Sequence, residues 1–501
     1  MWKRAVVKSL GDGTMGFITN HRDRKREKER RGDVVQAMAE TEQKPLFTGG
    51  MLRRLIIPLV IEQFLLMTVG MADTVMVTTA GEAAVSGVSL VDNVNILLMQ
   101  IFAALSTGGA VVVSQYLGRR DVDSARTAAK QLLYAVTAVA AVLTVLALIF
   151  REHLLRLLFG SISADVMDSA LAYFIATALA YPFMSIYNAG AALFRSMGNS
   201  RVSMFNSAIV NVVNIAVNAV LIFGFHMGAL GAGIGTLVSR MVASGMILFL
   251  LRREDCLLRI EGILHPELRW DMIRRILTIG IPTGLENGLF QMGKLVVLGL
   301  VTSFDVGVDL AVVGSAVAAN AIANSVASVI NVPGQAMGLA LVTVVGQCMG
   351  ARAPDQAVSY TGKLMGVTYL AMGILNLLSF LFAQPLVALF NLEPASQVLA
   401  VEVLRWCAVF TAIFWPSSFT LPNALRAAGD ARFTMAVALG SMFLFRVGLS
   451  YVLASDTLFG LPMPGLHLLG VWLAMFVDWI IRTSFFTVRF LRGKWKTIQV
   501  I

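Results

Sequence analysis

The chain has 501 residues, of which 57% are hydrophobic and only 14% are charged, and its mean hydropathy is +0.75. A soluble core of this size would need a larger polar surface, so the composition excludes a soluble globular protein and indicates an all-α polytopic membrane protein. The net charge of +10 lies in the tails and short loops, which is typical of a cytoplasmic membrane face and does not require a nucleic-acid partner.

Cysteine, histidine and motif content narrow the chemistry further. The three cysteines are far apart and form no Cys-x-x-Cys pair, so neither a disulfide framework nor a zinc site is predicted. The five histidines lie in a tail or near loops, which leaves carboxylates to carry any proton transfer inside the membrane. The sequence contains no nucleotide-binding loop, metalloenzyme motif or nucleophile triad, so we expect neither enzyme activity nor a cofactor.

The first predicted segment, residues 1–50, is a basic tail. Its run His21–Arg31 is mostly basic, and residues 1 to 45 lack the apolar region of a signal peptide. We expect a disordered or loosely helical cytosolic tail that is solvated or binds lipid headgroups.

From Met51 onward, apolar segments of about 20 residues or more follow one another with short loops between them. The second and eighth are long, and Gly108-Gly109 or Pro333-Gly334 can kink them. The twelve predicted transmembrane helices lie at approximately 52–80, 88–115, 127–150, 169–194, 203–225, 229–251, 272–301, 312–346, 361–384, 396–420, 433–455 and 467–490.

The loops differ in charge according to their position. Loops after odd-numbered helices offer few cations beyond Arg151 and Arg156, and they hold acids such as Asp305 and Asp456. By the positive-inside rule, both termini are therefore cytoplasmic. Loops after even-numbered helices carry the basic residues Arg119, Arg120, Arg126, Lys130, Arg195, Arg201, Arg252, Arg253, Arg259, Arg269, Arg274, Arg275, Arg352, Lys363, Arg426 and Arg432.

The sequence also repeats itself. Pro58 and Glu62 in the first predicted helix match Pro282 and Glu286 in the seventh. Six helices per half is an even number, so the halves share one orientation and are related by an axis along the membrane normal. We expect two six-helix bundles related by a pseudo-two-fold, an N-lobe at 51–260 and a C-lobe at 261–501, with a cavity between them. Later matches keep the same order: Ser114–Asp121 with Gly346–Asp355, Tyr181-Pro182 with Trp415-Pro416, Ala192–Arg201 with Asn423–Arg432, and Gly231 with Gly470.

This order of motifs resembles the multidrug and toxic compound extrusion (MATE) family, in its bacterial NorM- and DinF-like members. The motifs are MADTVMV in the first helix, QYLG with basic residues after the second, ALR-like segments after the fourth and tenth, and Pro-x-x-x-Glu in the seventh. The resemblance covers roughly Leu52 to Arg492. It implies an antiporter that exports organic, often cationic or aromatic, compounds in exchange for protons or sodium. We expect a monomer in the bacterial inner membrane.

Glu286 is the first candidate coupling residue. It lies about 16 Å along its helix from Arg275, near the middle of a hydrocarbon core roughly 30 Å thick. An unpaired carboxylate there is costly, and binding of a proton or a cation would neutralise it. The resemblance places it with the seventh-helix glutamate of NorM-type members. The structural alternative is a hydrogen bond to Asn287 or to a neighbouring helix.

Asp73 is the second candidate, about 28 Å along its helix from Arg54. It resembles the first-helix aspartate of the family's N-lobe cation site, and solvation at the interface is the alternative. Its expected partners are Asn214 and Asn218, which share one face of the fifth helix with Asn211 because they are spaced by three, four and seven residues. Hydrogen bonds between helices are the structural alternative for these asparagines. Thr236 matches a family threonine near the same site. If the ion is sodium, we expect it at Asp73 or Glu286.

Three positions depart from the family pattern. Asn218 stands where some archaeal and DinF-type members have an aspartate, so the N-lobe site carries one acid fewer. Residues 415–423 contain no acid where NorM-type members carry one, which weakens the case for a sodium site with several carboxylates in the C-lobe. Glu62 is an additional acid, and we include it among the candidates through its repeat relation to Glu286.

Three cations also lie inside predicted helices. Asp478 and Arg482 are spaced i, i+4, so we expect an internal ion pair between them. Lys294 follows Glu286 by two turns and would interact with it if the two approach, whereas Arg446 has no evident partner in the sequence. These cations leave zwitterionic or anionic aromatic substrates open.

Two other functions are alternatives for a chain of this composition. A lipid-linked oligosaccharide flippase of the related superfamily would have a more cationic central cavity and often extra helices. A membrane enzyme would have paired acids or histidines on facing loops, and the sequence lacks them. The sequence is compatible with either protons or sodium as the coupling ion, and it does not define the substrate.

Overall fold

The computed structural model describes residues 45–160, 163–262, 267–305, 315–458 and 461–501. Residues Gly49–Ile501 form one compact unit, and Met1–Thr48 form a separate one in which only residues 45–48 are described. The predicted basic tail therefore lies almost entirely outside the described residues.

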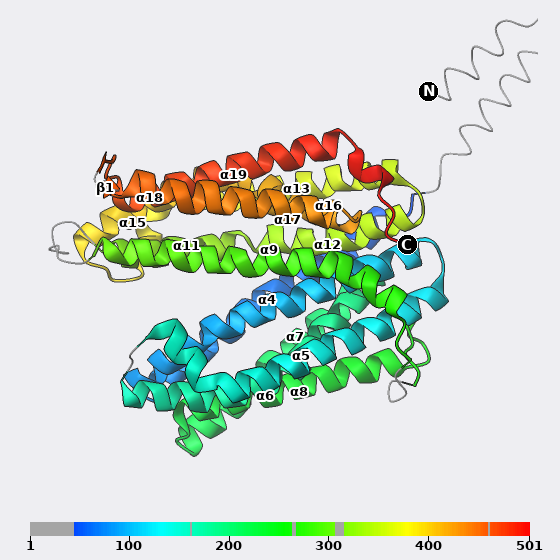
Figure 1. Cartoon of the computed structure of the whole chain (residues 1–501), viewed down its shortest axis with the longest axis horizontal. Helices are drawn as coiled ribbons and strands as arrows, with labels where there is room; N and C mark the ends of the chain where they lie inside the picture. The colour runs from blue at the N-terminus through cyan, green and yellow to red at the C-terminus, as the bar shows by residue number, and fades with distance from the viewer. Residues whose placement is uncertain (1–44, 161–162, 263–266, 306–314, 459–460) are drawn as a thin grey trace, which may run out of the picture. The chain divides into compact units, whose positions relative to one another are not determined.

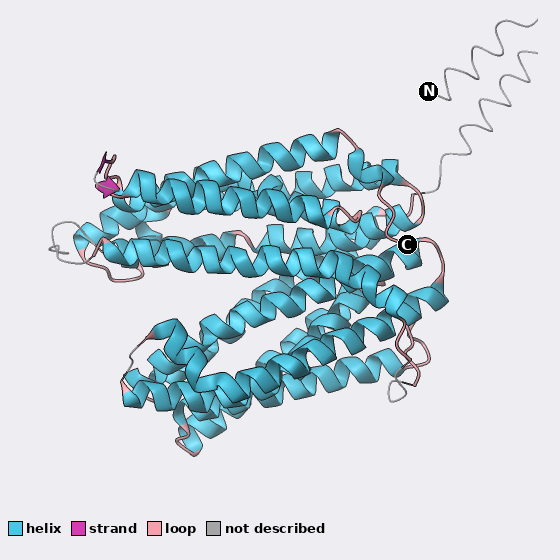
Figure 2. Cartoon of the chain, viewed as in Figure 1, coloured by secondary structure: helices cyan, strands magenta, loops and turns pink. Residues whose placement is uncertain are grey.

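The compact unit is built almost wholly of helices (Figures 1 and 2). Its first half contains α3 (Gly49–Thr78), α4 (Glu82–Gly118), α5 (Val122–Phe159), α6 (Ala164–Ser196), α7 (Ser200–Asn218), η1 (Ala219–Gly224) and α8 (Gly228–Arg252). Its second half contains α9 (Trp270–Ser303), α11 (Ala316–Ile330), α12 (Val332–Gly350), α13 (Pro354–Leu381), α14 (Ala383–Ala388), α15 (Pro394–Trp415), η2 (Pro416–Thr420), α16 (Leu421–Ala427), α17 (Ala431–Ser441), η3 (Met442–Gly448), α18 (Leu449–Ala454), β1 (Thr457–Leu458), β2 (Leu461–Pro462), α19 (His467–Leu491) and η4 (Lys494–Thr497).

The helical segments correspond to the predicted membrane spans. Among the described residues, eleven segments are long and apolar enough to cross a membrane. The α9 helix has 34 residues but is not one of the eleven, because polar side chains such as Glu286, Asn287, Gln291 and Lys294 interrupt its apolar sequence. With α9, the series matches the twelve predicted helices and confirms the all-α polytopic fold.

The eighth predicted helix is broken where proline was expected to bend it. The α11 helix ends at Ile330 and α12 begins at Val332, with Pro333 in its first turn. Proline lacks a backbone N–H and is tolerated in the first turn of a helix, where no partner is needed. In contrast, α4 stays helical through Gly108 and Gly109, and the missing side chain of Gly108 lets the backbones of α4 and α9 approach.

Three spanning segments contain π-helical turns at informative positions. The η1 turn directly follows Asn218 in the fifth helix, and η3, in the repeat-related eleventh helix, contains Arg446. The η2 turn begins at Pro416, which cannot donate a backbone hydrogen bond. Because π-turns often occur at functional sites, these interruptions mark the helices around the candidate residues.

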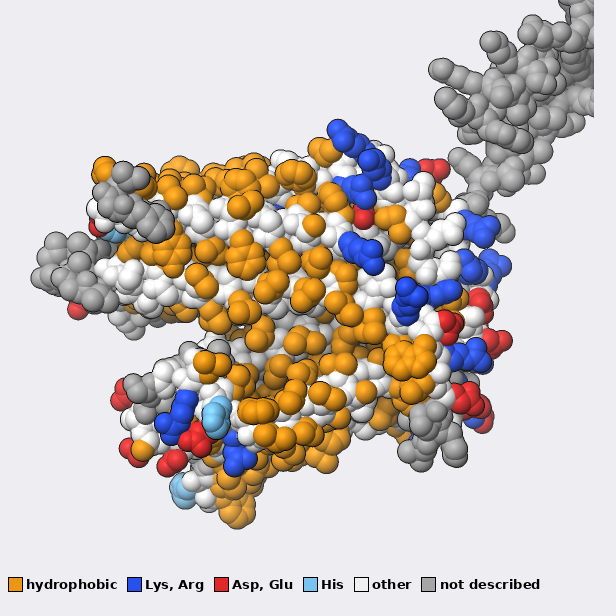
Figure 3. Space-filling view, viewed as in Figure 1, with side chains coloured by type: hydrophobic (Ala, Val, Ile, Leu, Met, Phe, Trp, Pro, Cys, Tyr) orange, Lys and Arg blue, Asp and Glu red, His pale blue; other side chains and the backbone are white. Residues whose placement is uncertain are grey.

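The helices form two lobes, α3–α8 and α9–α19, with a hollow between them. In Figure 3 the hollow opens at the end of the molecule that carries β1, and the lobes meet at the opposite end. Lys and Arg side chains gather mainly at this closed end, where the C-terminus also lies (Figures 1 and 3). Apolar side chains cover the flanks between the two ends, as expected for a surface in contact with lipid.

A pair of repeat-related segments joins the lobes at the closed end. Gln115 Nε2 of α4 donates to the Ala427 carbonyl of the C-lobe at 2.9 Å, and Gln347 Nε2 of α12 donates to the Ser196 carbonyl of the N-lobe at 2.7 Å. A Cβ on Gly118 would overlap the Gln347 carbonyl oxygen, and one on Gly350 would overlap the Gln115 carbonyl oxygen. We call Gln115, Gly118, Gln347 and Gly350 the Gln-Gly seal.

The seal predicts the effect of a single methyl group. In Gly118→Ala the new Cβ meets a backbone oxygen, which cannot rotate away, so the lobes must separate at this end and stability falls by about 1–3 kcal/mol. Thermal unfolding in detergent measures the loss, and thiol labelling of the buried Cys348 in a Cys256→Ser/Cys407→Ser background reports loosening beside the seal.

Gly362→Ala in α13 is the matched control, because nothing lies within 4 Å of its Cβ position. Equal melting temperatures and equal rates of Cys348 labelling in the two variants would show that the close approach at Gly118 does not contribute to stability.

Candidate cation and substrate site

Two repeat-related ion pairs lie inside the lobes. Arg195 Nη1 is 3.0 Å from Glu62 Oε1 in the N-lobe, and Arg426 Nη2 is 2.5 Å from Glu286 Oε1 in the C-lobe. Both glutamates are buried. Glu286 therefore bonds to a neighbouring helix, which is the structural alternative predicted for it, and the repeat duplicates an arginine together with the acid.

The two pairs differ in how completely they are satisfied. Ser203 Oγ donates to the second carboxylate oxygen of Glu62 at 2.7 Å, so both oxygens of this acid have partners. Glu286 Oε2 and Arg426 Nε are buried and have no hydrogen-bond partner among the described residues. Because an unpartnered buried polar atom is costly, the C-lobe pair retains the capacity to accept a proton, an ion or a substrate donor.

The N-lobe candidates form a continuous network between α3 and α7. Asn218 Nδ2 donates to Asp73 Oδ1 at 2.6 Å and also to Asn214 Oδ1 at 3.3 Å, so the structure brings these three residues together. Asn211 donates instead to the Leu65 carbonyl at 3.0 Å, which fastens α7 to α3. The predicted asparagine face of the fifth helix is confirmed, and its members divide between the Asp73 network and helix packing.

Asp92 of α4 is a second N-lobe acid that the sequence reasoning missed. Its Oδ1 accepts hydrogen bonds from Tyr173 at 2.9 Å and from Asn95 Nδ2 at 3.2 Å. The charges of Asp73 and Asp92 lie close enough to interact. The available signal was its position inside the predicted second helix, where an acid is unusual.

Several polar atoms in this network are buried and unpartnered. They include Asn214 Nδ2, Asn218 Oδ1 and Thr236 Oγ1, considering the described residues alone. Carboxylate, amide and hydroxyl oxygens are the ligands that hard cations prefer, and an acid pair can also share a proton. The described residues include no cluster of three or more His, Cys, Asp or Glu side chains, so a cation here would rely on amide and hydroxyl oxygens as well as acids.

The three cations predicted inside C-lobe helices, Lys294, Arg446 and Arg482, form no ion pair with Glu286 in the described residues. The predicted pair is confirmed, with Arg482 Nε 2.8 Å from Asp478 Oδ1. Arg446 reaches the other oxygen of Asp478 only at 4.0 Å. In the described residues Lys294 forms no ion pair with Glu286, and its Nζ lies 5.4 Å from the ring centroid of Phe290.

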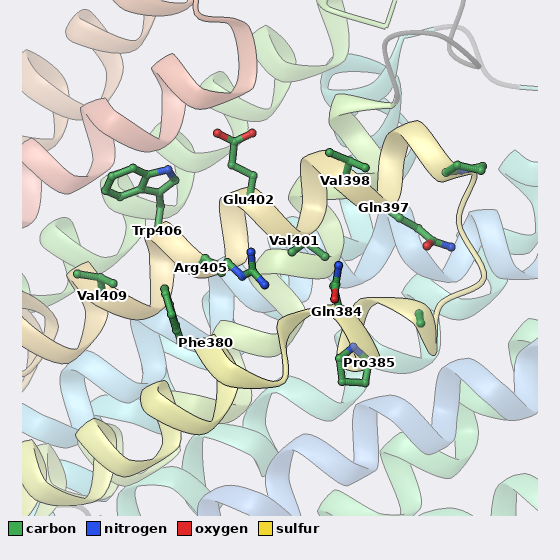
Figure 4. A pocket seen from close by; sticks show the side chains of 12 residues that line it. Phe380, Gln384, Pro385, Gln397, Val398, Val401, Glu402, Arg405, Trp406 and Val409 are labelled. Carbon is green, nitrogen blue, oxygen red and sulfur yellow. The ribbon is translucent and has the colours of Figure 1, made fainter.

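A separate groove lies on the outside of the C-lobe. It has a volume of about 880 Å³ and is lined by residues of α13, α14 and α15, including Phe380, Glu402, Arg405 and Trp406 (Figure 4). None of the candidate coupling residues lines it. A smaller cavity of about 70 Å³ lies between the lobes beside Arg195 and Thr343, next to the Gln-Gly seal.

Two pseudo-symmetric lobes of spanning helices, a hollow between them and buried acids within the helices define a multi-pass membrane transporter. The chain belongs to the MatE family, whose sequence model matches residues 58–220 and 282–452. The two matched segments begin at Pro58 and Pro282, where the repeat aligns the halves. The family predicted from the motifs is confirmed.

Named relatives and solved structures agree with this assignment. A probable multidrug resistance protein NorM of Thermotoga maritima is 26% identical over 460 residues, 89% of this chain and 93% of that protein. The multidrug export protein MepA of Staphylococcus saprophyticus is 25% identical over 257 residues, 51% of this chain and 56% of that protein. These names do not favour the flippase alternative.

The solved structures establish the fold. A multidrug resistance MATE family transporter of the MOP superfamily, in an outward-facing conformation, superposes with a TM-score of 0.78 at 20% identity, covering 89% of this chain and 94% of that one. A MOP superfamily transporter from Pyrococcus furiosus, described as having a binding pocket of reverse polarity, gives 0.79 at 20% identity, covering 90% and 96%.

The buried pair in the N-lobe predicts a strong stability effect. Glu62→Gln leaves the Arg195 charge buried without its acid, which should lower the free energy of unfolding by about 3–5 kcal/mol. The double variant Glu62→Gln/Arg195→Met removes both charges and should recover most of this stability. Thermal unfolding of the purified variants measures both effects.

The exposed Glu152–Arg156 pair supplies the control, because Glu152→Gln removes an acid whose side chain is half exposed and should change stability by less than about 1 kcal/mol. A Glu62→Gln variant as stable as Glu152→Gln would contradict the structural role of the buried pair.

Gly235 offers a way to disturb the Asp73 network without changing any polar residue. A Cβ at Gly235 would overlap Asn218 Oδ1, so Gly235→Ala should displace Asn218 from Asp73 and lower coupled transport at normal protein abundance.

Gly245→Ala in the same helix is the control, because nothing lies within 4 Å of its Cβ position. Transport assays in everted vesicles compare the two, and equal activity would argue that Asn218 is not needed at Asp73.

Proposed function

We propose that the chain is a secondary active antiporter of the bacterial inner membrane. It exports organic, often cationic or aromatic, compounds in exchange for protons or sodium, and it works as a monomer without a cofactor. The observation that carries the proposal is the N-lobe network, in which Asp73 and Asp92 lie among amide and hydroxyl atoms inside spanning helices. Relatives named as multidrug resistance and multidrug export proteins support the substrate class.

The charge distribution supports an orientation. Cations concentrated at the closed end favour its placement in the cytoplasm, and the same charge rule, applied to the loops in the sequence, places both termini there. The hollow between the lobes then faces outward, and the Gln-Gly seal closes the cytoplasmic side.

The N-lobe network suggests how a cation would act on the lobe. When Asp73 binds a proton or a cation, its carboxylate becomes a poorer acceptor for Asn218 Nδ2, and the link between α3 and α7 weakens. The η1 turn begins directly after Asn218, so the outer part of the fifth helix can adjust without disturbing Asn211. Exchange follows if the cation and the drug stabilise different states of the lobes.

The ion pairs in the two lobes have separate roles in this scheme. Glu62 keeps both oxygens satisfied and holds the first helix to the fourth. Glu286 has one oxygen without a partner and therefore remains a candidate for contact with a substrate or an ion. Thr236 lies beside Gly235, which contacts Asn218, and it adds a hydroxyl to the N-lobe site.

The test is the loss of titration at Asp73. Asp73→Asn keeps the size and hydrogen bonding of the side chain but cannot change charge, so it should reach the membrane and lose uphill export. Ethidium transport in proteoliposomes with independently imposed proton and sodium gradients measures the loss and identifies the ion.

Asp123→Asn is the matched control, because the Asp123 side chain is 96% exposed at the start of α5. Uphill export at the wild-type rate by Asp73→Asn, at equal abundance, would remove the coupling role from this residue.

A further inference from the structure

Three cations from three helices surround one aromatic ring in the C-lobe. Lys294 Nζ of α9, Arg446 Cζ of η3 and Arg482 Cζ of α19 lie 5.4, 5.2 and 4.9 Å from the ring centroid of Phe290. We call Phe290, Lys294, Arg446, Asp478 and Arg482 the Phe290 cluster. All five lie within spanning segments, where charge is costly and marks a functional site.

The cluster contains more positive than negative charge. Asp478 is its one acid, and it is completely buried. Its Oδ1 accepts from Arg482 Nε and from Ser441 Oγ, and its Oδ2 lies 4.0 Å from Arg446 Nη1. Three cations face one acid, so two positive charges stay uncompensated within the cluster. The Glu62–Arg195 and Glu286–Arg426 pairs, in contrast, match one acid with one base.

The donors with the fewest partners in the cluster belong to Lys294 and Arg446. Arg482 is committed to the structure, because it binds Asp478 and donates to the Ala438 carbonyl at 2.9 Å. A guanidinium carries five N–H groups, but among the described residues Arg446 donates one hydrogen bond, to the weakly accepting Met475 thioether sulfur, and lies 4.0 Å from Asp478 Oδ2. Lys294 has no hydrogen-bond or ion-pair partner among the described residues, and its side chain is exposed.

Lys294 belongs to α9, the C-lobe helix that contacts α4 of the other lobe, and its side chain is exposed. Gly280 lies against Leu105 of α4, and Lys294 follows it by fourteen residues, about 21 Å along the helix. The α4–α9 contacts continue outward to Gly288 beside Leu97. Lys294 lies beyond them, about 13 Å short of the end of α9.

Aromatic side chains extend from the cations into the lobe. Phe419 lies edge-on to Phe290 at 5.9 Å and stacks on Trp415 at 5.1 Å. Trp479 meets Phe419 at 6.2 Å, and its Nε1 is buried without a hydrogen-bond partner in the described structure. Aromatic rings next to cations that keep free N–H donors fit a flat apolar body that carries an anionic group.

We propose that the Phe290 cluster binds the anionic group of an amphiphilic aromatic acid or zwitterion, with Lys294 and Arg446 as its direct contacts. The Arg482–Asp478 pair holds the cluster in place. This substrate class refines the proposed export function and rests on it. A cationic drug without an acidic group gains nothing from these residues and would use the acids of the N-lobe.

The test compares two xanthene dyes of opposite charge on purified protein in nanodiscs of neutral lipid. Fluorescence anisotropy, with empty nanodiscs subtracted, measures the binding of carboxyfluorescein and of tetramethylrhodamine methyl ester. We expect wild-type protein to bind carboxyfluorescein. Lys294→Met should weaken the affinity for this dye by about tenfold or more, because one charge-assisted hydrogen bond contributes about that factor to binding. Lys294→Arg should keep binding, and no variant at this position should weaken the cationic dye.

Lys363→Met is the matched control, because Lys363 is an exposed lysine that also lies over an aromatic ring, 5.7 Å from that of Tyr360, outside the cluster. Three results would overturn the proposal: no carboxyfluorescein binding to wild type, unchanged binding in Lys294→Met, or an equal loss in Lys363→Met. The measurement needs no ion gradient, so its failure is separate from failure of the Asp73 transport test.

Discussion

The fold depends on the cost of burying charge where no water can reach. Each lobe places a glutamate on its first helix and an arginine on its fourth, and the two meet as a buried pair. Such a pair is weak evidence for net stability, but breaking it leaves an uncompensated charge, so it fixes which helices must be neighbours. The duplication of this pair sets the same helix arrangement in both lobes.

Against this common arrangement, the two lobes differ in polarity. The N-lobe adds Asp73 and Asp92 with one buried arginine, Arg240, within electrostatic range of Asp73. The C-lobe adds three cations around Phe290 and the single acid Asp478. An acidic network in one lobe and a basic cluster in the other can distinguish the two ends of a zwitterion, and separate sites for ion and substrate reduce direct competition between them.

Sequence alone predicted what local helix geometry determines. The spacing of Asp478 and Arg482 fixed their pairing, and the spacing of Asn214 and Asn218 placed both on one buried face. The partner of Glu62 could not be derived in this way, because Arg195 is 133 residues away and their contact depends on how two helices rotate against each other.

The misses have the same physical origin. Arg426 was not recognised as the partner of Glu286 because it lies 140 residues later in the chain, although the repeat had aligned both residues with Glu62 and Arg195. Asp92 was overlooked, and its link to Asp73 arises only when α3 and α4 pack in one lobe. Helical periodicity thus predicts partners within one helix, but it does not predict which residue of another helix will contact a given polar side chain.

The Gln-Gly seal has a consequence for how this transporter can change over evolutionary time. In its closest approaches, Gly118 and Gly350 lie against main-chain carbonyl oxygens of the other lobe. Close contact therefore requires glycine at these two positions, and it does not require complementary side chains on the two lobes. Residues that face the hollow can therefore vary in either lobe without refitting the other lobe at the closed end. The residues that close the seal are therefore separate from the residues that determine substrate specificity. Such a separation allows the substrate range to change while the closing contacts stay the same.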